Sequence, residues 1–179
     1  MIIVACLGNP ERKYAKTRHN IGFIIGKFIA DYYSISIKKK AFSSITGVGS
    51  IKGNEVLLLF PETYMNNSGK SVQGALTFYK STEKQLIVIH DEIELPFNIC
   101  KHKVGGGHKG HNGLRSIIQH IGSPDFYRFR FGVGRPDNPH ITVADYVLGN
   151  FTKEEMQSIE NQKDDYIQEI ESIITDLSA

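Results

Sequence analysis

The stretch "IIVACLGNP", residues 2–10, fixes the starting point for the fold. Its apolar run predicts a buried strand, and Gly8, Asn9 and Pro10 end that strand in a turn. The segment that follows, residues 19–33, carries apolar residues on one helical stripe. A buried strand followed by an amphipathic helix is the basic unit of an α/β protein.

This alternation continues along the chain. Further strands are predicted at 55–61, 85–96, 97–104 and 126–134, and a polar loop with a short strand at 38–51; further helices are predicted at 68–80, 114–122 and 152–177. We therefore expect one α/β domain over residues 1–179, with a mixed, mostly parallel sheet sandwiched by helices.

Two helix starts carry recognisable signals. Thr17 is placed to cap the first helix, and Thr152 with Glu155 forms a capping box for the last. A polar turn at 160–165 interrupts the apolar stripe of that last helix.

Composition narrows the class of protein. Of 179 residues, 40% are hydrophobic and 22% charged, with a net charge of +2, as expected for a globular protein in water. No apolar run reaches the roughly 20 residues of a membrane span. Cys6 and Cys100 lie in apolar stretches, which favours buried, reduced thiols and a cytoplasmic protein.

The glycine-rich segment "VGGGHKGHNGLRS", residues 104–116, invites comparison with known binding motifs. Gly105, Gly107 and Gly110 fit the dinucleotide pattern, but the acidic residue that the pattern needs must follow a strand, and Asp125 precedes one. The segment "SGKS" at 68–71 lacks a P-loop because Tyr64 stands where the first glycine belongs.

A zinc site is the third possibility in this region. His108 and His111 are three residues apart and His102 is near, but a glycine-rich loop positions metal ligands poorly. We expect no metal and no cofactor.

Polar side chains follow the predicted strands or open the helices after them. Asn9, His19, Asn66, Asp91 and Asn112 all lie at such junctions. Ligands gather at the carboxyl ends of strands in open α/β sheets. Together these residues offer a base, an orienting carboxylate and amides that donate and accept hydrogen bonds.

Six motifs in order resemble the bacterial peptidyl-tRNA hydrolase family. They are "CLGNP" (6–10), "KYAKTRHNIGF" (13–23), "PETYMNNSGKSV" (61–72), "IVIHDEIELP" (87–96), "GGGHKGHNGLRSI" (105–117) and "YRFRFGVGRP" (127–136). The resemblance implies a usually monomeric protein with a twisted mixed sheet between helices. It also implies metal-free hydrolysis of the ester that joins a peptide to the 3′ end of tRNA.

The resemblance also implies roles for individual residues. His19 would be the catalytic base and Asp91 its partner, and Asn9 would help to separate N-blocked from free aminoacyl-tRNA. The tRNA end and the peptide would lie against Tyr14, Tyr64, Met65, Asn66, His111 and Asn112. Lys103 and Arg130 would clamp a tRNA phosphate.

Pattern alone gives limited support to that clamp. Arg130 should point away from the core because Phe129 and Phe131 flank it in a strand, on the same side as Arg128. Spacing by itself favours a solvated basic face over a phosphate clamp, and only the family resemblance reverses that preference.

The chain departs from the family pattern at a few positions. Cys6, Glu11 and Lys109 stand where the family often has small residues, and the C-terminal part is short. A non-catalytic RNA-binding protein on the same scaffold is the alternative function, although such a protein would be expected to lack the His–Asp pair.

Overall fold

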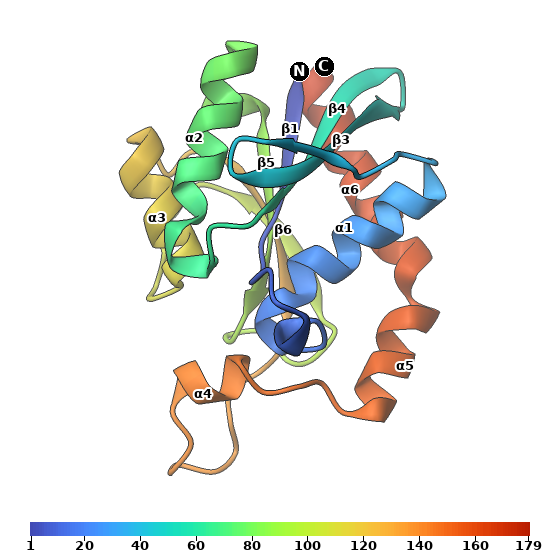
Figure 1. Ribbon diagram of the computed structural model, residues 1–179. Coiled ribbons are helices and arrows are strands. Elements are labelled where there is room, and N and C mark those ends of the chain that lie inside the picture. The colour runs from blue at the N-terminus through green and yellow to red at the C-terminus, as the bar shows by residue number, and fades with distance from the viewer.

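The computed structural model spans residues 1–179 and has one seven-stranded sheet between two helical layers (Figure 1). The strand order is β2-β3-β4-β1-β5-β7-β6. The strands are β1 (Ile2–Cys6), β2 (Lys39–Ala41), β3 (Ser44–Ile51), β4 (Asn54–Pro61), β5 (Leu86–Glu92), β6 (Cys100–Val104) and β7 (Tyr127–Gly132).

The sheet is mixed, as predicted. Strands β4, β1, β5 and β7 run parallel, while β3 and β2 at one side and β6 at the other are antiparallel to their neighbours. Strand β1 is central and entirely buried, because both of its faces are covered by helices.

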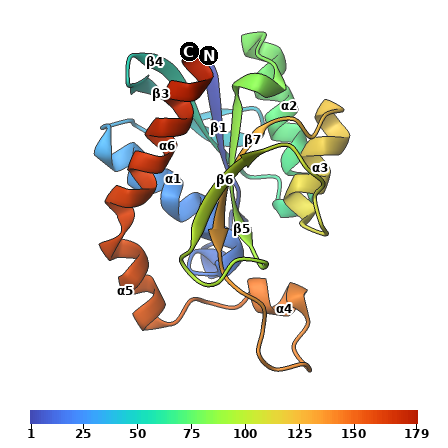
Figure 2. The ribbon, with the colours of Figure 1, turned by 180° about the vertical axis from the view of Figure 1, so that it is seen from behind.

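Two helical layers complete the core (Figures 1 and 2). On one face α1, α5 and α6 pack over a cluster of 24 buried residues, and on the other α2 and α3 pack over 14. The helices are α1 (Ile21–Tyr32), α2 (Ser68–Tyr79), α3 (Asn112–Ile121), α4 (Val143–Val147), α5 (Lys153–Asn161) and α6 (Lys163–Ser178).

Some predicted boundaries are wrong. Helix α1 begins at Ile21, after a 3-10 turn at Arg18–Asn20, and Thr17 does not cap it, because the Thr17 hydroxyl donates to the Tyr14 carbonyl instead. The single helix predicted at 152–177 is two helices that meet at Gln162, although its Thr152–Glu155 capping box is present.

Other elements lie where the sequence gave weaker signals. The polar loop predicted before β3 contains the short edge strand β2, and α4 was not predicted at all. Both cysteines are free, with Cys6 buried and Cys100 half-buried. None of the helices combines the length and apolar character needed to cross a bilayer.

Candidate active site

The carboxyl ends of β1 and β5 bring the predicted catalytic residues together. Asp91 is the second-last residue of β5, next to the end of β1, and the 3-10 turn before α1 carries His19 to that edge. Glycine is required where α1 crosses the strands, because a Cβ on Gly22 would lie 2.4 Å from the Leu7 nitrogen. This close crossing sets the height of His19 over the sheet.

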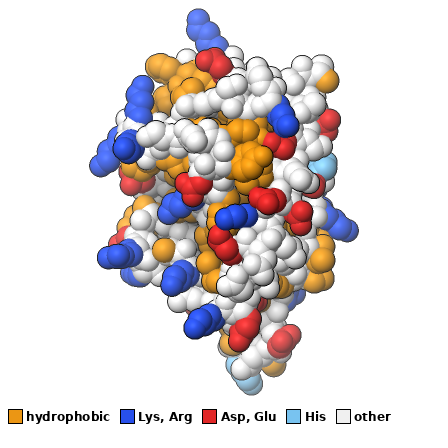
Figure 3. Space-filling model, turned by 90° about the vertical axis from the view of Figure 1, so that its right-hand side faces the viewer, with side chains coloured by type: hydrophobic (Ala, Val, Ile, Leu, Met, Phe, Trp, Pro, Cys, Tyr) orange, Lys and Arg blue, Asp and Glu red, His pale blue; other side chains and the backbone are white.

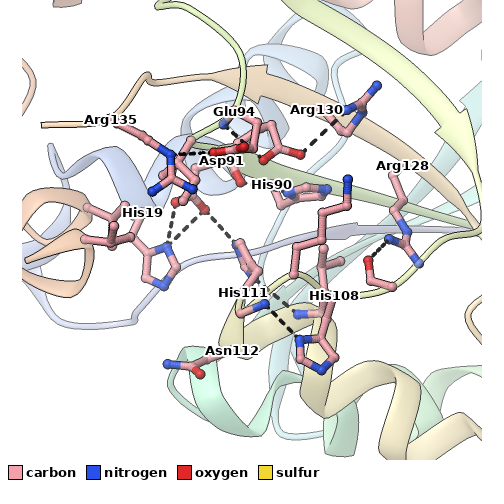
Figure 4. Close-up of a pocket in the computed structure, with 18 of the residues that line it drawn as sticks. His19, His90, Asp91, Glu94, His108, His111, Asn112, Arg128, Arg130 and Arg135 are labelled. Carbon is pink, nitrogen blue, oxygen red and sulfur yellow. Dashed lines mark hydrogen bonds and ion pairs between the residues drawn. The ribbon is translucent and has the colours of Figure 1, made fainter.

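Asp91 binds two histidines at once (Figure 4). His19 Nδ1 lies 2.8 Å from one carboxylate oxygen and 3.0 Å from the other, and His111 Nε2 lies 2.8 Å from the second oxygen. The carboxylate is 3% exposed, so its charge depends on these donors rather than on water. The predicted pairing of His19 with Asp91 is thus present in the geometry.

These contacts leave Nε2 of His19 free. Because Nδ1–H of His19 donates to Asp91, the lone pair of the neutral ring lies on Nε2, on the ring edge that faces the cleft. His19 can therefore accept a proton from a bound water.

Burial and charge act in opposite directions on this pair. Burial works to lower the pKa of His19, but the Asp91 charge and hydrogen bond outweigh it and raise that pKa above its ordinary value. Burial works to raise the pKa of Asp91, yet the two histidines hold it well below its ordinary value. Asp91 thus stays ionised beside a strengthened base.

A metal ion is poorly suited to this cluster, although the ligand atoms of His19, Asp91 and His111 lie within 4.8 Å of one another. A metal needs the lone pairs of both histidines, whereas the nitrogens that face Asp91 carry the protons that bind it. The zinc site considered from the sequence shares only His111 with this cluster, because His102 pairs with Glu169 and His108 accepts the Gly110 N–H.

Asn9 is built into the backbone beside His19. Asn20 receives the Asn9 N–H at 2.9 Å and donates to the Asn9 carbonyl at 3.0 Å. The Asn9 Oδ1 in turn accepts the Met65 N–H at 2.8 Å, next to Tyr64, whose φ of 62° is in the left-handed region. The Asn9 NH₂ group has no hydrogen-bond partner within the protein, so it can donate to a ligand.

The other predicted substrate residues come from three separate segments of the chain. Met65 is buried under α3, while Tyr64 and Asn66 are exposed in the segment before α2. Tyr14 is half-buried in the turn after β1, and Asn112 is exposed at the first turn of α3.

A cleft of about 460 Å³ is lined in part by the His–Asp pair. Six of the predicted residues line it: His19, Asp91, Lys103, His111, Asn112 and Arg130. Asn9, Tyr14, Tyr64, Met65 and Asn66 are outside its lining, so the predicted set divides between the cleft and the surface beyond His19.

Basic side chains gather at the far end of the cleft (Figure 4). Lys103 lies opposite Arg128 in the antiparallel pair of β6 with β7, so Lys103 and Arg130 are diagonal neighbours on one face. Burial, then Arg130 and Arg128, lower the pKa of Lys103. Glu92 lies 3.7 Å from Arg130 and neutralises part of this charge.

Arg128 shares that face but is not solvated. It is 1% exposed, and its guanidinium donates to the carbonyls of Gly106, Gly107 and Pro124. The alternation in 126–134 predicted the side correctly, but the buried role depends on the glycine-rich loop folding back over β7. Arg128 therefore holds the loop that leads to α3.

Sequence reasoning missed other residues of the site. His90 is buried, donates to the Asp91 carbonyl at 2.8 Å and has its pKa lowered to about 3, chiefly by burial. Asn20 supports Asn9, and Arg135 with Glu94 forms an ion pair at the cleft rim. For Asn20 and His90, their place next to His19 and Asp91 in the motifs "TRHN" and "IHDE" was the available signal.

Comparison with known proteins identifies the family of this chain. Residues 3–179 match the family model described as Peptidyl-tRNA hydrolase. Peptidyl-tRNA hydrolases of Syntrophotalea carbinolica and Geotalea uraniireducens are 45% and 46% identical over 174 residues, 97% of this chain and 91% and 90% of theirs. A crystal structure of peptidyl-tRNA hydrolase from Acinetobacter baumannii is 38% identical with a TM-score of 0.90, covering 98% of this chain and 89% of that one. The chain belongs to the peptidyl-tRNA hydrolase family.

Proposed function

We propose that this protein hydrolyses the ester between a peptide and the 3′ end of tRNA, with His19 as the general base. The observation that carries the mechanism is the hydrogen bond from His19 Nδ1 to buried Asp91, which leaves Nε2 open to the cleft. Family membership supplies the substrate class.

Each step has a residue to support it. His19 Nε2 takes a proton from water as the water oxygen attacks the ester carbonyl, and Asp91 stabilises the imidazolium that results. The imidazolium then returns the proton to the 3′ oxygen of the departing tRNA. The 3′ oxygen of tRNA is a good enough leaving group that water can attack the ester directly, so no covalent nucleophile is needed.

The divided site suggests how the two parts of the substrate lie. The peptide and the terminal nucleotide would occupy the side of Asn9, Tyr14, Tyr64, Met65 and Asn66. The tRNA body would lie toward Lys103 and Arg130. Between them, Asn112 and Asn66 are amides that can donate to the developing oxyanion.

Asn9 gives a reason for preferring N-blocked substrates. Its Oδ1 accepts the Met65 N–H, which orients the amide, and its NH₂ group has no partner within the protein and can donate to a ligand. A donor pairs with the carbonyl oxygen of a peptide bond but not with the free ammonium of aminoacyl-tRNA.

We also propose that the enzyme works as a monomer in the cytoplasm and without a cofactor. All the proposed groups come from one chain, and the substrate is made where translation takes place.

Release of an N-blocked amino acid from tRNA is the test. We expect the wild-type protein to cleave N-blocked aminoacyl-tRNA and to spare the unblocked form.

His19→Ala should remain folded and lose about 10²–10⁴-fold in kcat, because general-base catalysis contributes on that order. A folded His19→Ala protein that turns over like the wild type would exclude His19 as the base, and binding of tRNA without any hydrolysis by the wild type would favour the RNA-binding alternative.

A further inference from the structure

Two histidines bind Asp91, so contact with Asp91 does not by itself identify the catalytic base. Two histidine rings, from His19 and His111, approach its carboxylate at 2.8 Å, and their centroids are 5.1 Å apart. Their side chains are equally exposed, at 11% each. Distance to Asp91 and burial therefore do not tell which ring is the base and which supports it.

We infer that His111 is a positioning residue with its proton fixed on Nε2, which holds Asp91 toward His19 and leaves His111 no free lone pair to act as a base. The inference deepens the proposed function, since it rests on His19 and Asp91 being the catalytic pair.

The start of α3 fixes this tautomer. His111 is the N-cap residue of α3, and its Nδ1 accepts the backbone N–H groups of Gly113 at 3.1 Å and Leu114 at 3.2 Å. Those N–H groups have no partner inside the helix, so the cap satisfies them. An Nδ1 that accepts two hydrogen bonds carries the lone pair, and the proton of the neutral ring must be on Nε2, which faces Asp91.

The opposite tautomer would fail at both ends of the ring. A proton on Nδ1 would point at two N–H donors, and the lone pair on Nε2 would point at the carboxylate. His19 has no such constraint: its Nδ1 donates to Asp91 and its Nε2 has no partner within the protein. The two histidines around Asp91 thus carry opposite tautomers.

Packing keeps the His111 ring in this position. His90 meets it edge to face with centroids 5.1 Å apart. Gly113 leaves room below it, because a Cβ there would lie 2.6 Å from the Met65 sulfur and 3.1 Å from the His111 ring. The ring therefore links the start of α3, and with it Asn112, to the orientation of Asp91.

Long-range ¹H–¹⁵N spectra of the imidazoles test the tautomers directly on the intact protein at a pH where the rings are neutral. We expect the proton of His111 on Nε2 and that of His19 on Nδ1. A proton on Nδ1 of His111 would overturn the inference, and this readout does not depend on whether the protein cleaves peptidyl-tRNA.

Substitution separates the two contacts of His111. Asparagine is a preferred N-cap but too short to reach Asp91, so His111→Asn should keep the melting temperature near that of the wild type. It should lower kcat about tenfold with KM unchanged, since a hydrogen bond to a charged group is lost. His111→Ala should lose the same activity and also about 2–4 °C of Tm, because the cap is gone.

The pH profile of His111→Asn gives a readout that a merely structural role would not move. The His111 N–H has its positive end at Asp91, so its removal strengthens the hold of Asp91 on the His19 proton. The acid limb of the kcat profile should then move to higher pH. His120→Asn, on the same helix but outside the cleft, should leave the limb in place. A His111→Asn protein with wild-type kcat and acid limb would refute the positioning role.

Discussion

At the scale of single residues, the site depends on a carboxylate whose surroundings are unusual for a buried charge. Asp91 is almost fully buried, and no arginine or lysine pairs with it; two histidine N–H groups bind it instead. The charge is thus stabilised without a fixed cation, so it remains available to stabilise the imidazolium that forms on His19 during the reaction.

Asp91→Asn removes that charge with little change in shape. The pKa of His19, which the Asp91 charge raises, should fall, and the acid limb of the kcat/KM profile should move to lower pH. Turnover should fall by about 100-fold or more, because the imidazolium loses its partner. An asparagine also has one acceptor oxygen for two histidine donors, so its NH₂ group must face one of them.

A charge control is available in the same cleft. Glu94→Gln removes one negative charge from the rim, where Glu94 pairs with Arg135 and makes no bond to His19. Its acid limb should stay in place. An Asp91→Asn protein with an unshifted profile and normal turnover would contradict the pairing of Asp91 with His19.

The sequence predicted residues of this site unevenly, for a physical reason. His19 and Asp91 have reactive side chains at strand and helix ends, where a local pattern identifies them. Arg128 and Asn20 act on backbone groups of segments distant in sequence, Gly106 and Asn9. Nothing local to either residue indicates which carbonyl or N–H it will meet.

At the scale of elements, apolar patterning predicted most strands and helices but not their exact ends. Helix α1 was expected from residue 19, yet a tighter 3-10 turn precedes it because His19 and Asn20 are committed to Asp91 and Asn9. The break at Gln162 lies within the polar segment 160–165. The sequence pattern revealed this polar segment but did not indicate that the helix would end there. Strand β2 and helix α4 are short, mostly exposed and without a clear apolar period.

The crossing of α1 over the sheet gives a prediction at this scale. In Gly22→Ala the new methyl would lie 2.5 Å from the carbonyl oxygens of Leu7 and Ile89, which are strand backbone and cannot turn aside. Helix α1 must then lift, and we expect a loss of about 1–3 kcal/mol in the free energy of unfolding, measured in urea. Because His19 lies one turn before Gly22, kcat should also fall.

Gly74→Ala is the matched control, a helical glycine in α2 whose added methyl would meet Phe42 at an ordinary 3.5 Å. It should be neutral or more stable by up to about 1 kcal/mol, since alanine favours helices. Equal stability of Gly22→Ala and the wild type would show that the α1 crossing has room to spare.

At the scale of the whole molecule, the active-site cleft differs from the rest of the surface in its local charge, which the net charge of the chain does not reveal. The chain carries only +2 overall, and on the side where α1, α5 and α6 lie, acidic and basic side chains are interspersed (Figure 3). The cleft instead combines Lys103, Arg128 and Arg130 at one end. Strand pairing between β6 and β7 creates this concentration, and pairing is not visible in composition.

The last prediction follows from that concentration. Lys103 and Arg130 lie diagonally across two paired strands and line the cleft, where a phosphate could contact both. Contacts with phosphate release counterions, so binding weakens as salt rises. The double substitution Lys103→Ala and Arg130→Ala should raise KM for full-length peptidyl-tRNA and reduce the slope of log KM against log salt by about 0.7–0.9, the change expected when one phosphate contact is lost. Turnover of a minimal ester that lacks the tRNA body should barely change, because neither residue touches His19 or Asp91.

Lys39→Ala with Lys40→Ala removes the same charge from β2, at the opposite edge of the sheet, and should leave the slope unchanged. Equal damage to both substrates would mean that Lys103 and Arg130 support the fold or the chemistry and do not hold tRNA.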